Sequence, residues 1–246
     1  MIDLSIVIPT YKEEVLLPLL LESIAKQTVK PREVIVADNN SPDRTVEIAR
    51  NYGATVVKGG NVIEGRNNGF KATNSSVILF LDADVILPSK SFLKDVYNEF
   101  VSNKVDVASC FLKLDDAEGR KIKLKTLFTG YNALKLLGKV LRNPLLETGC
   151  FLMVKREVFE KIGGFSMDNP GIGEDYEFSK TAVKMGYRYY IIPAKVITSA
   201  RRFTSKNGTF RAILSGAMLF IIFLLGIYNK KKIMSFVKKV YGKLGG

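Results

Sequence analysis

Two carboxylates stand one residue apart where a strongly apolar run ends. The run is ILFL (78–81), and Asp82 and Asp84 follow it on either side of Ala83. Carboxylates at this spacing suit a hard divalent cation such as Mg²⁺ or Mn²⁺, which takes oxygen ligands and bridges to phosphate oxygens. An Asp at the end of a strand is also common in turns and helix caps. The stretch therefore predicts either a metal site that neutralises a diphosphate or an ordinary turn.

A second acidic pair, Glu174 and Asp175, follows the glycine-containing stretch NPGIG at the start of a helix predicted over 175–185. Acids in a first helical turn complement the helix dipole, so this pair also has a structural explanation. The chain has no histidine, which excludes Ser-His-Asp triads and HExxH zinc sites. Cys110 and Cys150 do not form a CxxC motif, and we expect them to be small buried hydrophobes. Catalysis by this chain would depend on carboxylates, Lys, Tyr, Cys or a metal.

Short β-rich runs alternate with helical patterns over the first hundred residues. Strands are predicted at 4–9, 33–38, 54–58 and 76–82, and helices at 13–29, 44–52 and 64–73. This alternation predicts an α/β fold with a mostly parallel central sheet flanked by helices. No GxGxxG or GxxxxGK[ST] loop follows a strand, so the usual dinucleotide or P-loop cradle is not expected.

In open α/β sheets, ligands bind outside the carboxyl ends of the strands. The residues predicted at those ends are Pro9, Thr10 and Tyr11, then Asp38, Asn39 and Asn40, and then Asp82, Ala83 and Asp84. We therefore expect a polar, acidic cluster at one edge of the sheet.

Capping residues predict where several helices begin and end. Ser41 is expected to be an N-cap with Pro42 in the first helical position, and Gly53 to end that helix. In the second half, Gly149 allows close backbone approach at a strand, Gly163 and Gly164 end the following helix, and Gly186 ends the next one.

Six motifs occur in the order and spacing of one enzyme family. They are SIVIPTYKEE, VIVADNNSPDRT, EGRNNGFKAT, ILFLDADVILP, ETGCFLMVKREVFEKIGGF and GEDYEFSKTAVKMGYR. Over residues 3–205 the chain resembles the family 2 glycosyltransferases, which are inverting enzymes of GT-A fold. The resemblance implies a transferase that moves a sugar from a nucleotide-diphosphosugar, either a UDP- or a GDP-sugar, to a hydroxyl of a lipid-linked or glycan acceptor, with Mn²⁺ or Mg²⁺ as cofactor.

The resemblance also implies site residues. Those implied to bind the nucleotide-sugar are Pro9, Thr10, Tyr11, Glu13, Asp38, Asn40, Arg66, Asp82, Ala83 and Asp84. Among them, Asp38 would accept a hydrogen bond from the ring N–H of the base, and Arg66 would touch the donor's phosphate or sugar. Asp84, with Asp82 beside it, would hold the metal together with the diphosphate and water, since some relatives use a histidine that this chain lacks. The implied phosphate or acceptor residues are Gly149, Arg201 and Arg202.

The acceptor hydroxyl must lose its proton as it attacks the anomeric carbon, and without histidine a carboxylate is the natural base. The family uses the second acid of the ED motif, which is Asp175 here, with Glu174 as the alternative.

Three other functions stay open. One is a polyprenyl-phosphate sugar synthase, because the SPD sequence at 41–43 is similar to that of dolichyl-phosphate mannose synthases. The acceptor of those enzymes is a phosphate and needs no base. The GED and GRNNG sequences favour a hydroxyl acceptor instead. A nucleotidyltransferase would carry a glycine-rich basic loop after the first strand, and PTYKEE lacks one. A non-catalytic nucleotide-binding scaffold at a membrane is the third.

The end of the chain is apolar and then basic. Residues 212–228 contain no charged side chain, whereas 229–246 contain six lysines and no acid, nearly half of the net charge of +13. Such a segment favours an anionic membrane surface. We therefore divide the chain into a catalytic domain, 1–208, and a hydrophobic and basic helical extension, 209–246, that either spans a membrane or lies at its interface. No secretory signal is recognisable at the N-terminus, so we expect the cytoplasmic face of a membrane and no nucleic-acid partner.

Overall fold

The computed structural model describes residues 1–114, 132, 133, 135, 136, 150–167 and 174–199. Residues Met1–Ser199 group into one compact unit. Its elements are β1 (Ile2–Thr10), α1 (Leu17–Ala25), β2 (Pro31–Asp38), α2 (Thr45–Asn51), β3 (Thr55–Lys58), α3 (Val62–Lys71), β4 (Val77–Leu81), β5 (Val85–Ile86), α4 (Phe92–Ser102), β6 (Val107–Leu114), β7 (Phe151–Lys155), α6 (Arg156–Ile162), α7 (Glu174–Lys184) and β8 (Tyr189–Thr198).

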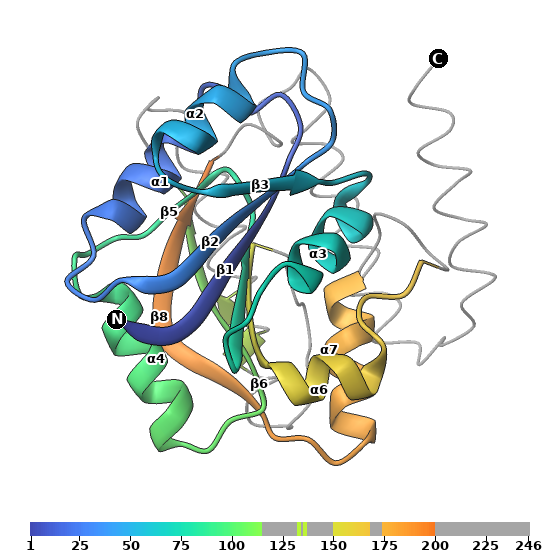
Figure 1. Ribbon diagram of the computed structural model, residues 1–246. Helices are drawn as coiled ribbons and strands as arrows, with labels where there is room; N and C mark the ends of the chain where they lie inside the picture. Colours follow the sequence, from blue (N-terminus) through green and yellow to red (C-terminus); the bar gives the residue numbers. More distant parts are fainter. Residues whose placement is uncertain (115–131, 134, 137–149, 168–173, 200–246) are drawn as a thin grey trace. The chain divides into compact units, whose positions relative to one another are not determined.

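The strands form one sheet in the order β3-β2-β1-β4-β7-β6-β8-β5 (Figure 1). The first four are parallel neighbours, and β6 and β8 are parallel to each other. Strand β7 runs antiparallel to both β4 and β6, and β5 runs antiparallel to β8. The predicted α/β fold with a mostly parallel central sheet is confirmed.

Both faces of the sheet are buried. Along β1, Leu4, Ile6 and Ile8 pack in one apolar cluster, while Val7 between them packs in a second one. The first cluster takes its helical residues from α1, α2 and α4, and the second from α3, α6 and α7, which lie on opposite sides of the sheet (Figure 1). This burial on two faces explains why the parallel strands are apolar at successive positions instead of alternating with polar residues.

Glycine helix ends agree with the prediction, but two helix starts do not. Residues Gly53, Gly163 and Gly186 have φ of +78°, +88° and +88°, and each lies one or two residues after the last residue of a helix, as expected. Helix α2 begins at Thr45 and not at Pro42, because the Ser41 hydroxyl donates to Asp38 and does not cap the helix.

Helix α1 is shorter than the predicted 13–29. Pro18 does lie in its first turn, as expected. Before the helix, Lys12 has a φ of +56°, and the backbone N–H of Glu13 donates to the Thr45 hydroxyl at 2.8 Å. These contacts tie residues 12 and 13 to the start of α2, so the helix begins only at Leu17.

Glu33 links residues at the edge of the sheet where the parallel strands begin. Its carboxylate accepts hydrogen bonds from Ser5 Oγ at 2.6 Å and from the backbone and side-chain amides of Asn74, both at 2.8 Å. Burial alone would raise the pKa of Glu33, but these hydrogen bonds outweigh burial and lower the pKa below its ordinary value of 4.5.

Several predictions concern residues outside the described ranges. These are Gly149, Arg201, Arg202 and the extension 209–246. The boundary at residue 208 and the membrane association of the extension stay predictions. In the portion of the chain that the structure describes, no helix combines the length and the apolar character needed to cross a membrane.

Candidate active site

Parallel register brings the predicted strand-end residues to one edge of the sheet. Thr10 of β1 pairs with Asp38 of β2, and Val7 pairs with Phe80 of β4. Two residues further along each strand, Pro9 and Asp82 therefore lie at the same level. The acidic cluster expected at this edge is present, and its carboxylates are buried: Asp38 is 5% exposed, and Asp82 and Asp84 are each 7% exposed.

Arg66 connects this edge to α7. One terminal nitrogen of its guanidinium lies 2.9 Å from Glu174 Oε1 and 3.3 Å from Asp175 Oδ1, and the other lies 3.0 Å from Asp82 Oδ1. The Arg66 side chain is only 2% exposed, and its guanidinium also lies 5.4 Å from the centre of the Phe165 ring. Three segments distant in sequence, namely α3, the end of β4 and the start of α7, meet at this guanidinium.

The charges of this network depend on one another. Burial disfavours the guanidinium charge, but Asp82, Asp175 and Glu174 together more than compensate and raise the pKa of Arg66 above its ordinary value. Arg66 is thus permanently cationic and balances part of the negative charge. Among the described residues, this one cation is shared by three carboxylates at the edge where a ligand would bind.

The GRNNG motif packs α3 tightly on the sheet. A Cβ on Gly69 would lie 2.3 Å from Val7 Cγ1, and one on Gly65 would lie 3.1 Å from Pro9 Cβ, so both glycines permit close approach to β1. Asn68 donates to the backbone oxygen of Gly59 at 3.1 Å. These contacts set the depth at which Arg66 enters the site.

Asn67 holds the turn after α6. Its side chain donates to the backbone oxygen of Phe165 at 2.9 Å and accepts from the backbone N–H of the same residue at 3.0 Å. The GRNNG and GGF motifs are therefore in contact, and Phe165 is fixed where its ring meets Arg66.

Asp38 joins the loops that follow β1 and β2. Its Oδ1 accepts from Thr10 Oγ1 at 2.9 Å and from Ser41 Oγ at 2.6 Å, and its Oδ2 accepts from the backbone N–H of Ser41 at 2.8 Å. The Ser41 hydroxyl in turn accepts from the backbone N–H of Lys12 at 2.9 Å. Asn40 in this turn has a φ of +55°. Both the turn role and the ligand role considered for Asp38 are compatible with this position.

The Asp82-Ala83-Asp84 stretch forms a tight turn between β4 and β5. The N–H of Val85 donates to the backbone oxygen of Asp82 at 3.2 Å, and the N–H of Ser199 donates to the backbone oxygen of Asp84 at 3.2 Å. Ala83 is 5% exposed. The end of β8 thus lies against the backbone of the second acid.

A divalent cation fits this turn only with help from a ligand. Within the described ranges, no group of three or more acidic or cysteine side chains is placed to hold a metal ion. Asp82 is paired with Arg66, so in a metal site at this turn Asp84 would be the principal protein ligand. Mg²⁺ is usually bound through one or two carboxylates and the phosphates of a substrate. The hard oxygen donors of this turn fit such a shared site.

The other residues implied for nucleotide binding surround this edge. Pro9 and Thr10 end β1, and Tyr11, which is 51% exposed, directly follows them. Glu13 lies in the next loop and contacts α2 through its backbone. The ligand-binding roles implied for these residues stay predictions.

Lys135 was not singled out from the sequence. It is fully buried, and its ammonium lies 2.6 Å from Ser109 Oγ, which in turn donates to the backbone oxygen of Phe151 at 3.3 Å. Phe151 pairs with Leu81, the residue before Asp82. A lysine among leucines in an amphipathic stretch gives no sign of such burial, so the pattern alone could not identify it.

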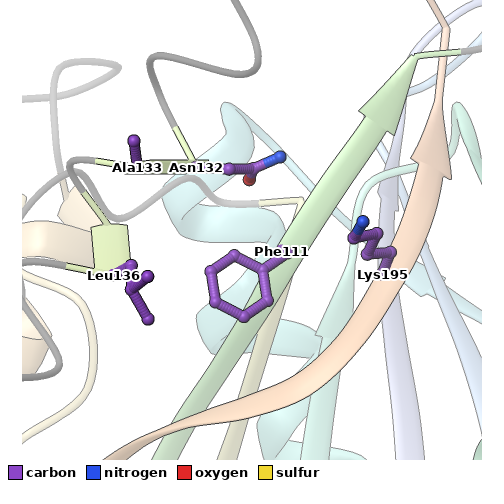
Figure 2. Close-up of a pocket in the computed structure, with 5 residues that line it drawn as sticks. All are labelled: Phe111, Asn132, Ala133, Leu136 and Lys195. Atoms are coloured by element: carbon purple, nitrogen blue, oxygen red, sulfur yellow. The ribbon is translucent and has the colours of Figure 1, made fainter.

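A pocket of about 320 Å³ lies beside β6 and β8 (Figure 2). It is lined by Phe111, Asn132, Ala133, Leu136 and Lys195. The Phe111 ring lies between Leu136 and Lys195 (Figure 2). The pocket therefore combines an aromatic surface, an aliphatic side chain, an amide and a cation.

The sequence profile described as Glycosyl transferase family 2 matches residues 5–163. The O-antigen chain rhamnosyltransferase RfbN of Salmonella typhimurium is 23% identical over 216 residues, which are 83% of this chain and 68% of that protein. The 4,4'-diaponeurosporenoate glycosyltransferase of Staphylococcus haemolyticus is 37% identical over 107 residues, 40% of this chain and 28% of that protein.

Solved structures agree in fold. The mannosyltransferase PcManGT from Pyrobaculum calidifontis, in complex with GDP-Man and Mn²⁺, has a TM-score of 0.67 at 24% identity, covering 88% of this chain. S. aureus TarS 1-349 in complex with UDP has a TM-score of 0.59 at 19% identity, covering 89% of this chain. The chain spans less than two thirds of these structures, 62% and 65% of their lengths.

Proposed function

The chain belongs to glycosyl transferase family 2 and has the GT-A fold, and we propose that it transfers a sugar from a nucleotide-diphosphosugar to a hydroxyl of a lipid-linked or glycan acceptor, with inversion at the anomeric carbon. One observation carries the proposal: Arg66 joins Asp82 to Asp175, which places a carboxylate of α7 beside the acidic turn. RfbN is named for O-antigen chains, and a further relative, GgaB of Bacillus subtilis, for minor teichoic acid biosynthesis. Both names support a glycan acceptor.

In the proposed reaction, Asp175 takes the proton of the acceptor hydroxyl. The hydroxyl oxygen forms a bond to the anomeric carbon as the bond to the diphosphate oxygen breaks, and the electron pair of that bond leaves with the diphosphate. Arg66 donates to Asp175 Oδ1 and so fixes the orientation of the carboxylate. Glu174, bonded to the same nitrogen of Arg66, is the alternative base.

Asp84 would hold Mn²⁺ or Mg²⁺ together with the donor's diphosphate, and PcManGT, whose complex contains GDP-Man and Mn²⁺, supports this choice of metal. A cation bound there neutralises the charge that develops on the leaving diphosphate.

We place the acceptor near the pocket beside β6. Phe111 and Leu136 offer it apolar contact, and Lys195 offers a positive charge. An acceptor with an apolar portion and an anionic group, as a lipid-linked sugar has, suits this lining.

The test of the reaction separates binding from chemistry. Full-length protein is titrated calorimetrically with UDP, dTDP, GDP and CDP in the presence of Mn²⁺, and transfer of labelled sugar into membrane extract is measured. We expect at least one nucleotide to bind, Asp84→Asn to weaken that binding at least about tenfold, and Asp175→Asn to bind normally while transfer falls about 10²- to 10⁴-fold. Glu174→Gln tests the alternative base, because a large loss of transfer in this variant instead of in Asp175→Asn would identify Glu174 as the base. If folded wild-type protein binds none of the four nucleotides, the proposed function is wrong.

We also propose that residues 209–246 associate with the cytoplasmic face of a membrane, because an uncharged segment precedes the lysine-rich end. Full-length protein should sediment with vesicles that contain phosphatidylserine, and replacing Lys230, Lys231 and Lys232 by Gln should weaken sedimentation. Equal recovery in the supernatant with and without vesicles would contradict this.

A further inference from the structure

We propose that the pocket beside β6 binds the phosphate and the adjoining apolar chain of a lipid carrier, so that the acceptor is a sugar linked to a lipid phosphate or diphosphate and not a lipid-free glycan. The inference rests on the proposed function and deepens it, because that function leaves both kinds of acceptor open. It follows from the side chains that one face of β6 and β8 presents near the acidic turn.

Strand alternation brings two lysines and an aromatic ring to one face of the sheet. Leu112 of β6 packs in the first apolar cluster, so its neighbours Phe111 and Lys113 point to the other face. Phe111 pairs with Lys195 of β8, and side chains of paired residues lie on the same face. Both lysines are exposed. Two cations therefore lie beside the Phe111 ring, one along its own strand and one across from it.

The segment around Asn132 forms another wall of the pocket. Its side chain donates to the backbone oxygen of Leu112 at 2.8 Å and accepts from the N–H of the same residue at 3.2 Å. The Lys135 ammonium lies 2.6 Å from Ser109 Oγ, on β6 as well. These contacts attach the segment to β6 and hold Leu136, which is 51% exposed, in the lining of the pocket. An apolar wall is therefore in place without a ligand.

The charges around the pocket are positive. Within the described part of the chain, no acidic side chain lines it, and neither Lys113 nor Lys195 has an ion-pair partner. An ammonium binds phosphate through charge-assisted hydrogen bonds, while Phe111 and Leu136 offer surface for an apolar chain. A neutral glycan would use neither feature, and an anionic glycan without a lipid would leave the apolar surface uncovered. A lipid phosphate uses both.

The place of the pocket along β8 also fits an acceptor. Thr198 pairs with Val85, the residue after Asp84, and the N–H of Ser199 donates to the backbone oxygen of Asp84 at 3.2 Å. Lys195 precedes Thr198 on the same strand, so at about 3.3 Å per residue it lies about 10 Å along β8 from the acidic turn. A phosphate bound by Lys195 therefore leaves room for a sugar between the phosphate and the turn.

Calorimetry of the full-length protein with farnesyl phosphate tests the pocket directly. EDTA is present and nucleotide is absent, so that no metal at the acidic turn contributes. Farnesol and inorganic phosphate each lack one half of this probe, and we expect farnesyl phosphate to bind at least about tenfold more tightly than either. Lys195→Gln should weaken farnesyl phosphate binding at least about fivefold and leave farnesol binding unchanged, whereas Phe111→Ala should weaken both. Lys94→Gln, at an exposed position of α4, is the matched control and should change neither.

Transfer of labelled sugar into membrane extract tests the acceptor itself. The product is partitioned between water and an organic solvent that extracts lipid-linked sugars, and we expect the label in the solvent. With the extract as the varied substrate, Lys195→Gln should raise KM at least about fivefold and leave kcat close to that of wild type.

The outcomes distinguish this inference from the function that it presupposes. If the labelled product is a lipid-free glycan, or if Lys195→Gln, folded by circular dichroism, binds farnesyl phosphate as wild type does, the lipid-carrier site is wrong and the transferase proposal stands. The site is also wrong if Lys195→Gln weakens sedimentation with phosphatidylserine vesicles as strongly as it weakens farnesyl phosphate binding, because the pocket would then take a membrane headgroup. If no nucleotide binds in the presence of Mn²⁺, the transferase proposal itself is wrong.

Discussion

Replacing Arg66 by Met should strongly destabilise the fold. Methionine fills similar space without the charge, and the variant leaves Asp82, Glu174 and Asp175 buried without their common cation. At an effective dielectric of about 20, a pair of unit charges about 4 Å apart attracts by about 4 kcal/mol, so three pairs give about 12 kcal/mol before opposing terms. Repulsion among the carboxylates and desolvation of four charges oppose this attraction.

Breaking a buried ion pair by removing one partner typically costs about 3 to 5 kcal/mol, and we expect a loss of that size in the free energy of unfolding. The matched control is Arg32→Met, which removes the same charge from a surface pair with Asp3 at 3.3 Å, whose side chains are 53% and 43% exposed. That loss should be about 0 to 1 kcal/mol. Both are measured by urea unfolding of the full-length protein, followed by circular dichroism.

A compensating variant completes the experiment. Adding Asp82→Asn and Glu174→Gln to Arg66→Met removes two of the three carboxylate charges that Arg66 pairs with, so part of the lost stability should return. The reasoning is refuted if Arg66→Met costs no more than Arg32→Met, or if the added substitutions lower stability further.

Two more predictions concern backbone packing and pH. In Gly59→Ala the new Cβ would lie 2.6 Å from a backbone oxygen of β2, so the substitution should lower the free energy of unfolding in urea by about 1 to 3 kcal/mol and weaken UDP binding by displacing Asp38. Gly53→Ala is the control, because Gly53 has a φ of +78° and nothing lies within 4 Å of its new Cβ. It should cost about 1 to 2 kcal/mol and leave UDP binding unchanged. Because the pKa of Glu33 in the folded protein lies below 4.5, its carboxylate stabilises the fold above that pH, and this stabilisation is lost as the pH falls through the folded pKa. The loss of unfolding free energy caused by Glu33→Gln, measured in urea, should therefore be largest near pH 7 and shrink toward about pH 3. A loss that does not change with pH would contradict this.

The strand-end residues could be predicted because the first strands are short, apolar and regularly spaced. A βαβ order places their carboxyl ends at one edge, so Thr10, Asp38 and Asp82 follow from the positions of the strands alone. Glu174 and Asp175 could be placed at a helix start by the same local logic. What these residues contact was not predictable in this way.

Arg66 shows why. By its type and its place near a helix start it would more often be a solvated surface charge, yet it is 2% exposed, and its partners lie 16, 108 and 109 residues away. Such pairs depend on how α7 packs, which no local pattern records. The prediction that Ser41 caps a helix was wrong for a local reason. The same stretch of sequence favours both an N-cap and a turn around Asp38, and the hydrogen bonds to Asp38 favour the turn.

The span of the Arg66 network also sets when the enzyme can become active during synthesis. Asp82 emerges soon after Arg66, but Glu174 is translated 108 residues later, roughly 5 to 20 seconds at common elongation rates. Until then the nascent chain lacks Glu174 and Asp175, and with them the base that we propose. Transfer by the proposed base therefore has to wait until α7 has left the exit tunnel.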